Sequence, residues 1–262
     1  MQERHKNRKI YFEEQGKTTA QYVIPYMEKV MDINDQVRVL EIGCGEGGNL
    51  MPFIERGCEV VGIDLNELQI DRARTYIEET VPHAKAILIY DDMFNIDPKE
   101  LGSFDLIFMR DVIEHIHDQE KFMPFLANFI KPRGKIFFGF PPWRMPFGGH
   151  QQICRSRFLS KLPFFHLLPM PLYKGVLQSF GEPTKTVEDL VEIKNTGISI
   201  QRFEKIVSES GYVFDRKDLF FINPNYEIKF GLRPRKLSGL IKPIPFVRDF
   251  FTTCYYCVIS KG

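Results

Sequence analysis

The chain has 262 residues, of which 44% are hydrophobic and 26% charged. These values are ordinary for a globular protein and exclude a disordered or collagen-like chain. The length predicts one elaborated domain, or one domain with a cap. Thirty-five Lys and Arg against 34 Asp and Glu give a net charge of +1, so we expect no nucleic-acid partner.

The sequence predicts a cytoplasmic protein without a transmembrane segment. Met1–Lys9 is polar and basic, and no apolar stretch of a secretory signal follows it. The longest apolar run, Leu162–Tyr173, is too short to span a bilayer and is broken by prolines. Five cysteines, an odd number, favour free thiols in a reducing compartment.

Short β-type runs alternate with helical patterns from about residue 37 to residue 140. The β-type runs are Val37–Ile42, Glu59–Ile63, Ala86–Tyr90, Phe104–Met109 and Lys135–Phe140. A helix is predicted over Leu65–Thr80, with Asn66 as its N-cap, and another over Asp118–Ile130, ending at the breaker residues 131–134. This alternation predicts βαβ units and therefore an α/β fold whose parallel sheet is covered on both faces.

The alternation stops after Phe140. Residues 143–197 are rich in proline and aromatic residues and contain no strand pattern, so we expect an irregular, mobile cap inserted there. A helix over Ser199–Ser210 follows, and β-type runs near Tyr212–Ile222 and Thr252–Ser260 close the chain. We also expect a helix near Thr19–Met31, lying across the mouth of the site described next.

A glycine-rich turn follows the first predicted strand. Gly43, Gly45 and Gly48 satisfy G-x-G-x-x-G, and Asp64 ends the second strand 21 residues after Gly43. Glycines allow a ligand to approach the backbone closely, and an acidic residue at this distance holds the hydroxyls of a ribose. The pattern therefore predicts a nucleotide-type cofactor, and NAD is one candidate.

The acidic residues around this turn favour a different cofactor. Glu41 shares a strand face with Val37 and Val39 and is expected to point into the crevice, and Asp91-Asp92 follow the third strand. A carboxylate repels the pyrophosphate of a dinucleotide but attracts the sulfonium and ammonium groups of S-adenosylmethionine. The sequence thus favours S-adenosylmethionine over NAD.

Five segments, in this order, resemble the class I S-adenosylmethionine-dependent methyltransferases: LEIGCGEGGNL (40–50), VVGIDLN (60–66), DDMF (91–94), FDLIFMRDVIEHI (104–116) and FIKPRGKIFFGF (129–140). The resemblance implies a Rossmann-like, doubly wound sheet of seven mostly parallel strands with an antiparallel last strand. It implies that the cofactor contacts Glu41, Gly43, Cys44, Gly45, Asp64, Leu65, Asp91, Asp92, Met93, Arg110 and Asp111. Within this set, Asp64 holds the ribose, Leu65 and Met93 lie beside the adenine, and one of Asp91 and Asp92 binds the adenine amine.

Four parts of the chain are expected on this basis. They are an N-terminal helical segment over the cofactor mouth (1–34), the cofactor-binding core (35–142), an inserted substrate cap (143–198), and the C-terminal helix with the closing strands (199–262).

His150 is the first candidate for a catalytic base. It follows Gly148 and Gly149 after the fifth strand, and imidazole titrates near neutral pH. Its Pro-Pro…Gly-Gly-His context resembles a subgroup of bacterial methyltransferases, some associated with surface glycans. His115 is a second candidate; we interpret Glu114-His115 as the family's ordinary pair and expect no metal ion.

Two other clusters receive structural interpretations. Cys254 and Cys257 are three residues apart in a β-type run, so their thiols should lie on opposite faces of the sheet. The basic residues Arg233, Arg235 and Lys236 are interpreted as part of a solvated loop, with contact to an anionic substrate as the alternative.

Together these features predict a methyltransferase that acts on a small-molecule, lipid-linked or glycan acceptor, at an oxygen atom. The aromatic residues of the cap, among them Phe165 and Tyr173, are expected to exclude water and contact this acceptor. The alternatives are an NAD(P)-dependent oxidoreductase and a methyltransferase acting on protein or nucleic acid. The oligomeric state cannot be read from the sequence.

Overall fold

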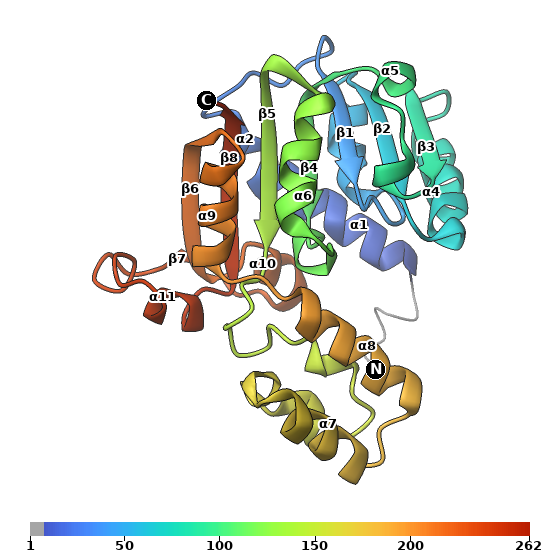
Figure 1. The fold of residues 1–262 in the computed structure, drawn as a ribbon. Helices are drawn as coiled ribbons and strands as arrows, with labels where there is room; N and C mark the ends of the chain where they lie inside the picture. The colour runs from blue at the N-terminus through green and yellow to red at the C-terminus, as the bar shows by residue number, and fades with distance from the viewer. Residues whose placement is uncertain (1–7) are drawn as a thin grey trace.

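The fold is an α/β sandwich around a single sheet, seen in a computed structural model that describes residues 8–262 (Figure 1). In these residues the sheet has eight strands in the order β3-β2-β1-β4-β5-β8-β6-β7. The strands are β1 Arg38–Ile42, β2 Glu59–Asp64, β3 Ala86–Tyr90, β4 Phe104–Arg110, β5 Ile130–Phe140, β6 Tyr212–Ile222, β7 Arg235–Lys236 and β8 Cys254–Lys261.

The strand directions confirm the predicted Rossmann-like arrangement. β1 to β5 pair in parallel, whereas β8 lies between β5 and β6 and runs antiparallel to both. The expected number of seven strands is one too low, because the two-residue strand β7 adds to the outer edge of β6. So short a pairing leaves no periodic pattern in the sequence.

Helices cover both faces of this sheet. They are α1 Arg8–Thr18, α2 Ile24–Met27, α3 Met51–Ile54, α4 Glu67–Thr80, α5 Pro98–Leu101, α6 Gln119–Phe125, α7 Met170–Ser179, α8 Thr184–Thr196, α9 Ile200–Glu209, α10 Asn225–Phe230 and α11 Val247–Phe250. One hydrophobic core joins α6 and α9 to the sheet, and a second joins α1 to α4 to its other face. Successive residues of β1 alternate between the cores, Val39 in one and Leu40 in the other, as a doubly wound sheet requires.

The cysteine pair of β8 follows the same alternation. Cys254 belongs to one hydrophobic core and Cys257 to the other, and both are buried free thiols. The prediction that they lie on opposite faces is confirmed.

The N-terminal helix starts earlier than expected. We expected a helix near Thr19–Met31, but α1 begins at Arg8, the first described residue, and a π-helical turn over Thr19–Val23 connects it to α2. The apolar pattern of α1 is weak, because only Phe12 among its apolar residues is buried. Gly48 allows this helix to approach, since a Cβ at Gly48 would overlap the Phe12 carbonyl oxygen.

The breaker residues 131–134 lie inside a strand. We expected a helix up to Ile130 and a strand from Lys135, but β5 already begins at Ile130. The register against β4 shifts between the pairs Phe104–Ile130 and Leu106–Lys135, so the extra residues form an irregularity within the strand.

The inserted cap is helical, which corrects the expectation of an irregular segment. α7 and α8 lie side by side below the sheet (Figure 1). They pack around a small hydrophobic core of their own, which includes Phe165 and Tyr173. These two aromatic residues are therefore buried inside the cap instead of facing an acceptor. Glu182 stiffens the cap further, because its carboxylate accepts hydrogen bonds from the amides of Arg155 and Ser156, both at 2.8 Å.

No helix within residues 8–262 is long and apolar enough to cross a membrane.

Candidate functional site

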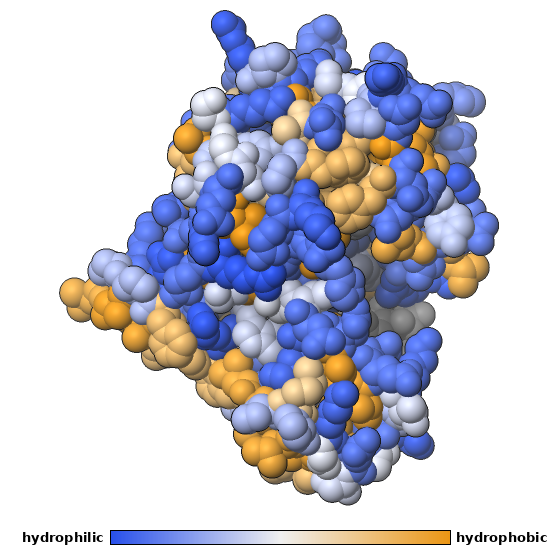
Figure 2. Space-filling model, in the orientation of Figure 1, coloured by the Kyte–Doolittle hydropathy of each residue, from blue (hydrophilic) through white to orange (hydrophobic). Residues whose placement is uncertain are grey.

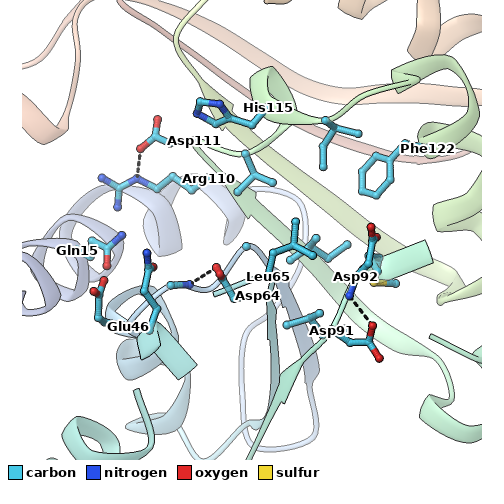
Figure 3. A pocket seen from close by; sticks show the side chains of 18 of the residues that line it. Gln15, Glu46, Asp64, Leu65, Asp91, Asp92, Arg110, Asp111, His115 and Phe122 are labelled. Carbon is cyan, nitrogen blue, oxygen red and sulfur yellow. Dashed lines mark hydrogen bonds and ion pairs between the residues drawn. The ribbon is translucent and has the colours of Figure 1, made fainter. Parts of the chain in front are cut away.

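A cavity of about 380 Å³ lies at the carboxyl ends of β1 to β4, where open α/β sheets bind ligands (Figure 3). Helix α1 contributes Arg8, Tyr11 and Gln15 to its wall. The remaining lining residues are Ile42, Gly43, Gly45, Glu46, Ile63, Asp64, Leu65, Gln69, Asp91, Asp92, Met93, Phe94, Arg110, Asp111, Val112, His115, Ile116 and Phe122. Of the expected cofactor residues, all but Glu41 and Cys44 line this cavity.

The glycine turn forms the floor of the cavity. Gly43 and Gly45 have φ angles of 72° and 53°, a backbone conformation that favours glycine. A Cβ at Gly43 would overlap Val112, and one at Gly45 would lie 2.9 Å from the Gln69 amide oxygen. Cys44, between them, is buried in the core on the side of α3 and α4.

The amides of this turn are already engaged. Gly43 and Cys44 donate to the Ile63 carbonyl oxygen, at 2.8 and 3.1 Å, and Gly47 donates to the Cys44 carbonyl oxygen. Gly45 donates to Asp64 Oδ2 at 2.8 Å. A pyrophosphate at a glycine-rich turn needs free amides, so this geometry disfavours a dinucleotide.

Asp64 both faces the cavity and holds the glycine turn in place (Figure 3). Its second oxygen, Oδ1, accepts a hydrogen bond from the Asn66 amide at 2.8 Å. Each carboxylate oxygen can accept further hydrogen bonds, so the side chain remains able to bind a ligand diol. Leu65 beside it is 67% exposed and offers an apolar surface at the rim.

Asp91 and Asp92 both line the cavity but have different local roles. Asp91 Oδ1 accepts from the Asp92 amide at 2.7 Å and from Asn95 Nδ2 at 2.9 Å. Asp92 caps the turn Met93–Asn95, since its Oδ1 accepts from the Phe94 amide at 2.9 Å. Met93 is buried and provides apolar lining next to Asp92.

A buried polar chain connects the cavity to Glu41. Arg110 Nη1 donates to Asn49 Oδ1 at 2.9 Å, and Asn49 Nδ2 donates to Glu41 Oε1 at 2.8 Å. Thr19, from the π-helical turn, also donates to Asn49 Oδ1 at 2.9 Å. Arg110 therefore faces the cavity, and Glu41 lies behind Asn49.

The expected orientation of Glu41 needs correction. Its side chain is fully buried and does not line the cavity. Burial raises the pKa of Glu41 from 4.5 to about 8, although hydrogen bonding from Asn49 and the charge of Arg110 oppose the rise. The direct electrostatic argument against a dinucleotide consequently rests on the carboxylates that line the cavity and not on Glu41.

Carboxylates dominate the charged lining of the cavity. Five acidic residues line it, Glu46, Asp64, Asp91, Asp92 and Asp111, against the two guanidinium groups of Arg8 and Arg110. Glu46 is paired with Arg8 and lies 3.7 Å from Arg72. The side of the cavity formed by the ends of β2 and β3 is therefore acidic, as expected from the sequence.

The two candidate bases meet at one end of the site. His115 lines the cavity, and the ring of His150 packs edge-on against it with centroids 4.9 Å apart. Glu114 is buried, and neither of its carboxylate oxygens has a hydrogen-bond partner. Glu114, His115 and His150 each offer one potential metal-ligand atom, and these three atoms lie within 4.8 Å of one another. That this cluster binds no metal ion stays a prediction.

The environment of this cluster changes its protonation. Burial lowers the pKa of His150 to about 4, with further contributions from His115 and His166, instead of the value near 6.5 expected from the sequence. Burial also lowers the pKa of His115, opposed by the charge of Asp111. Burial and Asp111 together raise the pKa of Glu114 well above its ordinary value. At neutral pH both imidazoles are therefore uncharged.

Sequence reasoning missed several residues of the site. Tyr11 and Gln15 come from the helix that was placed too late in the chain, and Asn49 and Thr19 are polar residues buried between elements. Asn49 follows the glycine turn directly, and its neighbours Gly48 and Leu50 are small or apolar. A single polar amide side chain between such residues is the sequence signal that could have identified Asn49 as part of the site.

The residues present fit S-adenosylmethionine. Glu41 has a buried carboxylate oxygen, Oε2, without a partner, beside the part of the site where Arg110 and Asn49 meet. Positive φ angles and the absence of Cβ atoms at Gly43 and Gly45 give a ligand close access to the backbone. The acidic rim suits a cofactor that carries two positive groups.

Comparisons with known sequences agree with this fit. The family model of the methyltransferase domain matches residues 11–160. A ubiquinone biosynthesis O-methyltransferase of Rhizobium etli is 37% identical over 105 residues, covering 38% of this chain and 40% of the relative. That of Coxiella burnetii is 30% identical over 115 residues, covering 44% and 47%. The chain thus matches less than half the length of these curated relatives.

Solved structures share the fold at low sequence identity. A magnesium protoporphyrin IX methyltransferase from Synechocystis, with SAH bound, is 14% identical, with a TM-score of 0.55, covering 94% of this chain and 84% of that one. A putative sarcosine dimethylglycine methyltransferase from Galdieria sulphuraria is 16% identical, with a TM-score of 0.60, covering 93% and 85%.

The family model spans more than half of the chain, and the glycine turn, Asp64 and the Asp91-Asp92 pair all fall within it. This match does not support the oxidoreductase alternative. The chain belongs to the methyltransferase domain family, within the class I S-adenosylmethionine-dependent methyltransferases, and its cofactor is S-adenosyl-L-methionine.

Proposed function

We propose that the protein transfers the methyl group of S-adenosylmethionine to an oxygen atom of a small-molecule acceptor. The observation that carries this proposal is the acidic cavity at the strand ends, which lies next to two neutral imidazoles. The relatives named as O-methyltransferases support oxygen as the acceptor atom.

Each wall of the cavity has a part in holding the cofactor. Asp64 binds the ribose hydroxyls while its other contacts keep the glycine turn in place. Asp92 binds the adenine amine through its free oxygen, and Leu65 and Met93 pack against the ring. Asp111 and the Arg110–Asn49–Glu41 chain lie at the methionine end.

When bound, S-adenosylmethionine supplies a methyl group that is already activated on a positively charged sulfur. The task of the protein is then to align the acceptor oxygen and to exclude water, and held geometry contributes roughly 7–11 kcal/mol to such reactions. His150, with His115 beside it, accepts the proton of the acceptor hydroxyl. A weakly basic imidazole suits this step, because the oxygen becomes more acidic as its bond to carbon forms.

The proposed acceptor is a small-molecule, lipid-linked or glycan compound, and the proposed location is the cytoplasm. The cap that carries His150 packs against the turn after β4. Gln119 Nε2, at the start of α6, joins the two, since it donates to the carbonyl oxygens of Ile113 in that turn and of Thr196 in α8, both at 2.8 Å. We place the acceptor site beside His115 and His150, where the cavity reaches the cap. The net charge of +1 disfavours nucleic acid.

Isothermal titration calorimetry tests the cofactor site directly. We expect S-adenosylhomocysteine and S-adenosylmethionine to bind with micromolar or better affinity, and NAD to bind at least about 100-fold more weakly, a difference of about 2.7 kcal/mol. Tighter binding of NAD than of S-adenosylhomocysteine would refute the proposal. Screening hydroxylated small molecules for methyl uptake then tests the acceptor class.

A further inference from the structure

An apolar loop projects from the molecule beside the end of the sheet (Figure 1). It comprises residues 240–251, follows β7 and contains α11. Five of its large apolar side chains are exposed: Leu240, Ile244, Phe246, Val247 and Phe251. Leu240 is the most exposed large apolar side chain among residues 8–262, at 84%. Figure 2 shows hydrophobic side chains at this projecting edge.

The base of the apolar loop is firmly attached to the protein. Asp249 is fully buried, and its Oδ2 accepts hydrogen bonds from Arg144 Nη1 at 3.1 Å and from the Ile200 amide at 3.2 Å. Arg248 donates to Glu204 Oε2. Phe250 packs against Phe164 of the cap, with ring centroids 6.0 Å apart. The fold thus holds the apolar side chains outward, where they would otherwise collapse onto the surface.

Unpaired cations accompany these apolar residues. Within residues 8–262, Arg233, Arg235 and Lys242 are exposed and form no ion pair, and the only acidic residue of the segment 231–251 is the buried Asp249. The net charge of +1 for the whole chain conceals this local excess. Exposed apolar side chains next to free Lys and Arg have the composition of a surface that enters a lipid interface.

We propose that the apolar loop docks the protein on the surface of an anionic phospholipid bilayer. Leu240 and Ile244 enter the boundary between head groups and acyl chains, while Arg233, Arg235 and Lys242 contact lipid phosphates. A second copy of the chain fits less well, because a symmetric contact would place the same cations opposite one another.

This docking brings the cap close to the bilayer through the Phe164–Phe250 contact. It goes beyond the proposed function and does not depend on it, because the apolar loop contributes no side chain to the cofactor cavity.

Flotation with lipid vesicles tests the proposal. We expect the full chain to float with vesicles that contain phosphatidylglycerol, and to float much less with vesicles of pure phosphatidylcholine. Leu240→Asp should reduce the bound fraction about tenfold, since it removes an apolar group that enters the bilayer and adds a negative charge near anionic lipid. Lys242→Glu should also reduce binding, and raising the salt concentration to about 0.5 M should weaken it by screening.

Matched variants on other surfaces provide the controls. Leu68→Asp changes a leucine that is 67% exposed on α4, and Lys99→Glu changes an exposed lysine on α5, which lies at the far end of the sheet from α11 (Figure 1). Both controls should float like the unaltered protein. All variants should keep its unfolding temperature and its affinity for S-adenosylhomocysteine, because the altered side chains are exposed and lie outside the cavity.

Several results would overturn the proposal: no flotation of the unaltered protein, equal flotation with both vesicle types, or equal losses in Leu68→Asp and Leu240→Asp. Light scattering that shows a dimer dissolved by Leu240→Asp would assign the loop to a second copy instead. Failure to bind S-adenosylhomocysteine, with flotation intact, would refute the proposed function and leave the docking surface standing.

Discussion

Asp64 illustrates how one side chain serves both the ligand and the loop around it. Because its carboxylate also holds the Gly45 amide, its removal affects the glycine turn as well as the ribose contact. We expect Asp64→Ala to weaken S-adenosylhomocysteine binding by about 1.5–3 kcal/mol, the range for hydrogen bonds to a charged group. Calorimetry measures this loss, and unchanged affinity would show that Asp64 does not hold the ribose.

A matched control is available for this variant. Asp97 also caps a short helix, since its Oδ1 accepts from the Lys99 amide at 2.8 Å, but it does not line the cavity. Asp97→Ala should therefore leave cofactor affinity unchanged.

His150 is the candidate base whose pKa differs most from the value that the sequence predicted. We expect His150→Ala to lower kcat about 100-fold, the lower end of the usual range for a lost base, with little change in S-adenosylmethionine affinity. Because the pKa of His150 lies at about 4, activity should not fall between pH 8 and pH 6 through its protonation, and the loss should begin only near pH 4 to 5. Steady-state kinetics against pH provides the measurement.

His117→Ala is the control for this experiment, because His117 is exposed and pairs with Glu192 away from the cavity. It should retain kcat. Full activity of His150→Ala with the same pH profile would mean that His150 has only a structural part.

Glu41 makes stability depend on pH. The unfolded chain ionises this carboxyl near pH 4.5, whereas the folded chain keeps it protonated up to about pH 8. Unfolding therefore releases a proton in this window, so this group lowers the stability of the cofactor-free protein as the pH rises from 4.5 to 8. Glu41→Gln should remove that part of the decline in unfolding temperature; a variant with the same slope as the unaltered protein would contradict the shift.

At the scale of single elements, a helix N-cap residue gave a reliable local signal in the sequence. Asn66 was predicted as the N-cap of the helix after β2, and its Oδ1 accepts from the Gln69 amide at 3.2 Å. Asn66→Ala should cost about 1 kcal/mol of unfolding free energy, and Asn66→Asp should largely restore it, because aspartate caps equally well. Chemical denaturation measures both; equal stabilities of all three proteins would show that the cap contributes nothing.

The elements that were placed wrongly lack such signals. Only Phe12 among the apolar residues of α1 is buried, so this helix has no periodic apolar stripe that would reveal it in the sequence. In the cap, α7 and α8 follow prolines, which indicate breaks but also begin helices.

At the scale of the whole molecule, the cap has a hydrophobic core separate from the two cores that flank the sheet. We therefore expect it to open as one unit, at lower free energy than the central strands. Hydrogen exchange should be faster in α8 than in β1, and α7 and α8 should exchange together. Protection of α8 equal to that of β1 would show that the cap opens only with the global fold. We still expect the cap to be mobile, but because its hydrophobic core is separate and not because its backbone is irregular.

The sequence by itself determined the features that depend on neighbouring residues. The glycine turn, the acidic residues at the strand ends and the alternation of strands and helices are all local patterns, and local backbone preferences and burial periodicity are sufficient to produce them. From these, together with the family resemblance they carry, followed the fold class, the cofactor and ten of the 21 residues that line the cavity.

Only the tertiary structure decided which distant side chains meet. Thr19 and Arg110 are 91 residues apart and both contact Asn49, and this arrangement places Glu41 behind the cavity wall. Likewise, His150 loses its ordinary pKa because the fold packs it against His115 and buries it. Burial and charge are properties of the packed neighbourhood, and side chains brought together from separate elements leave no periodic pattern in the chain.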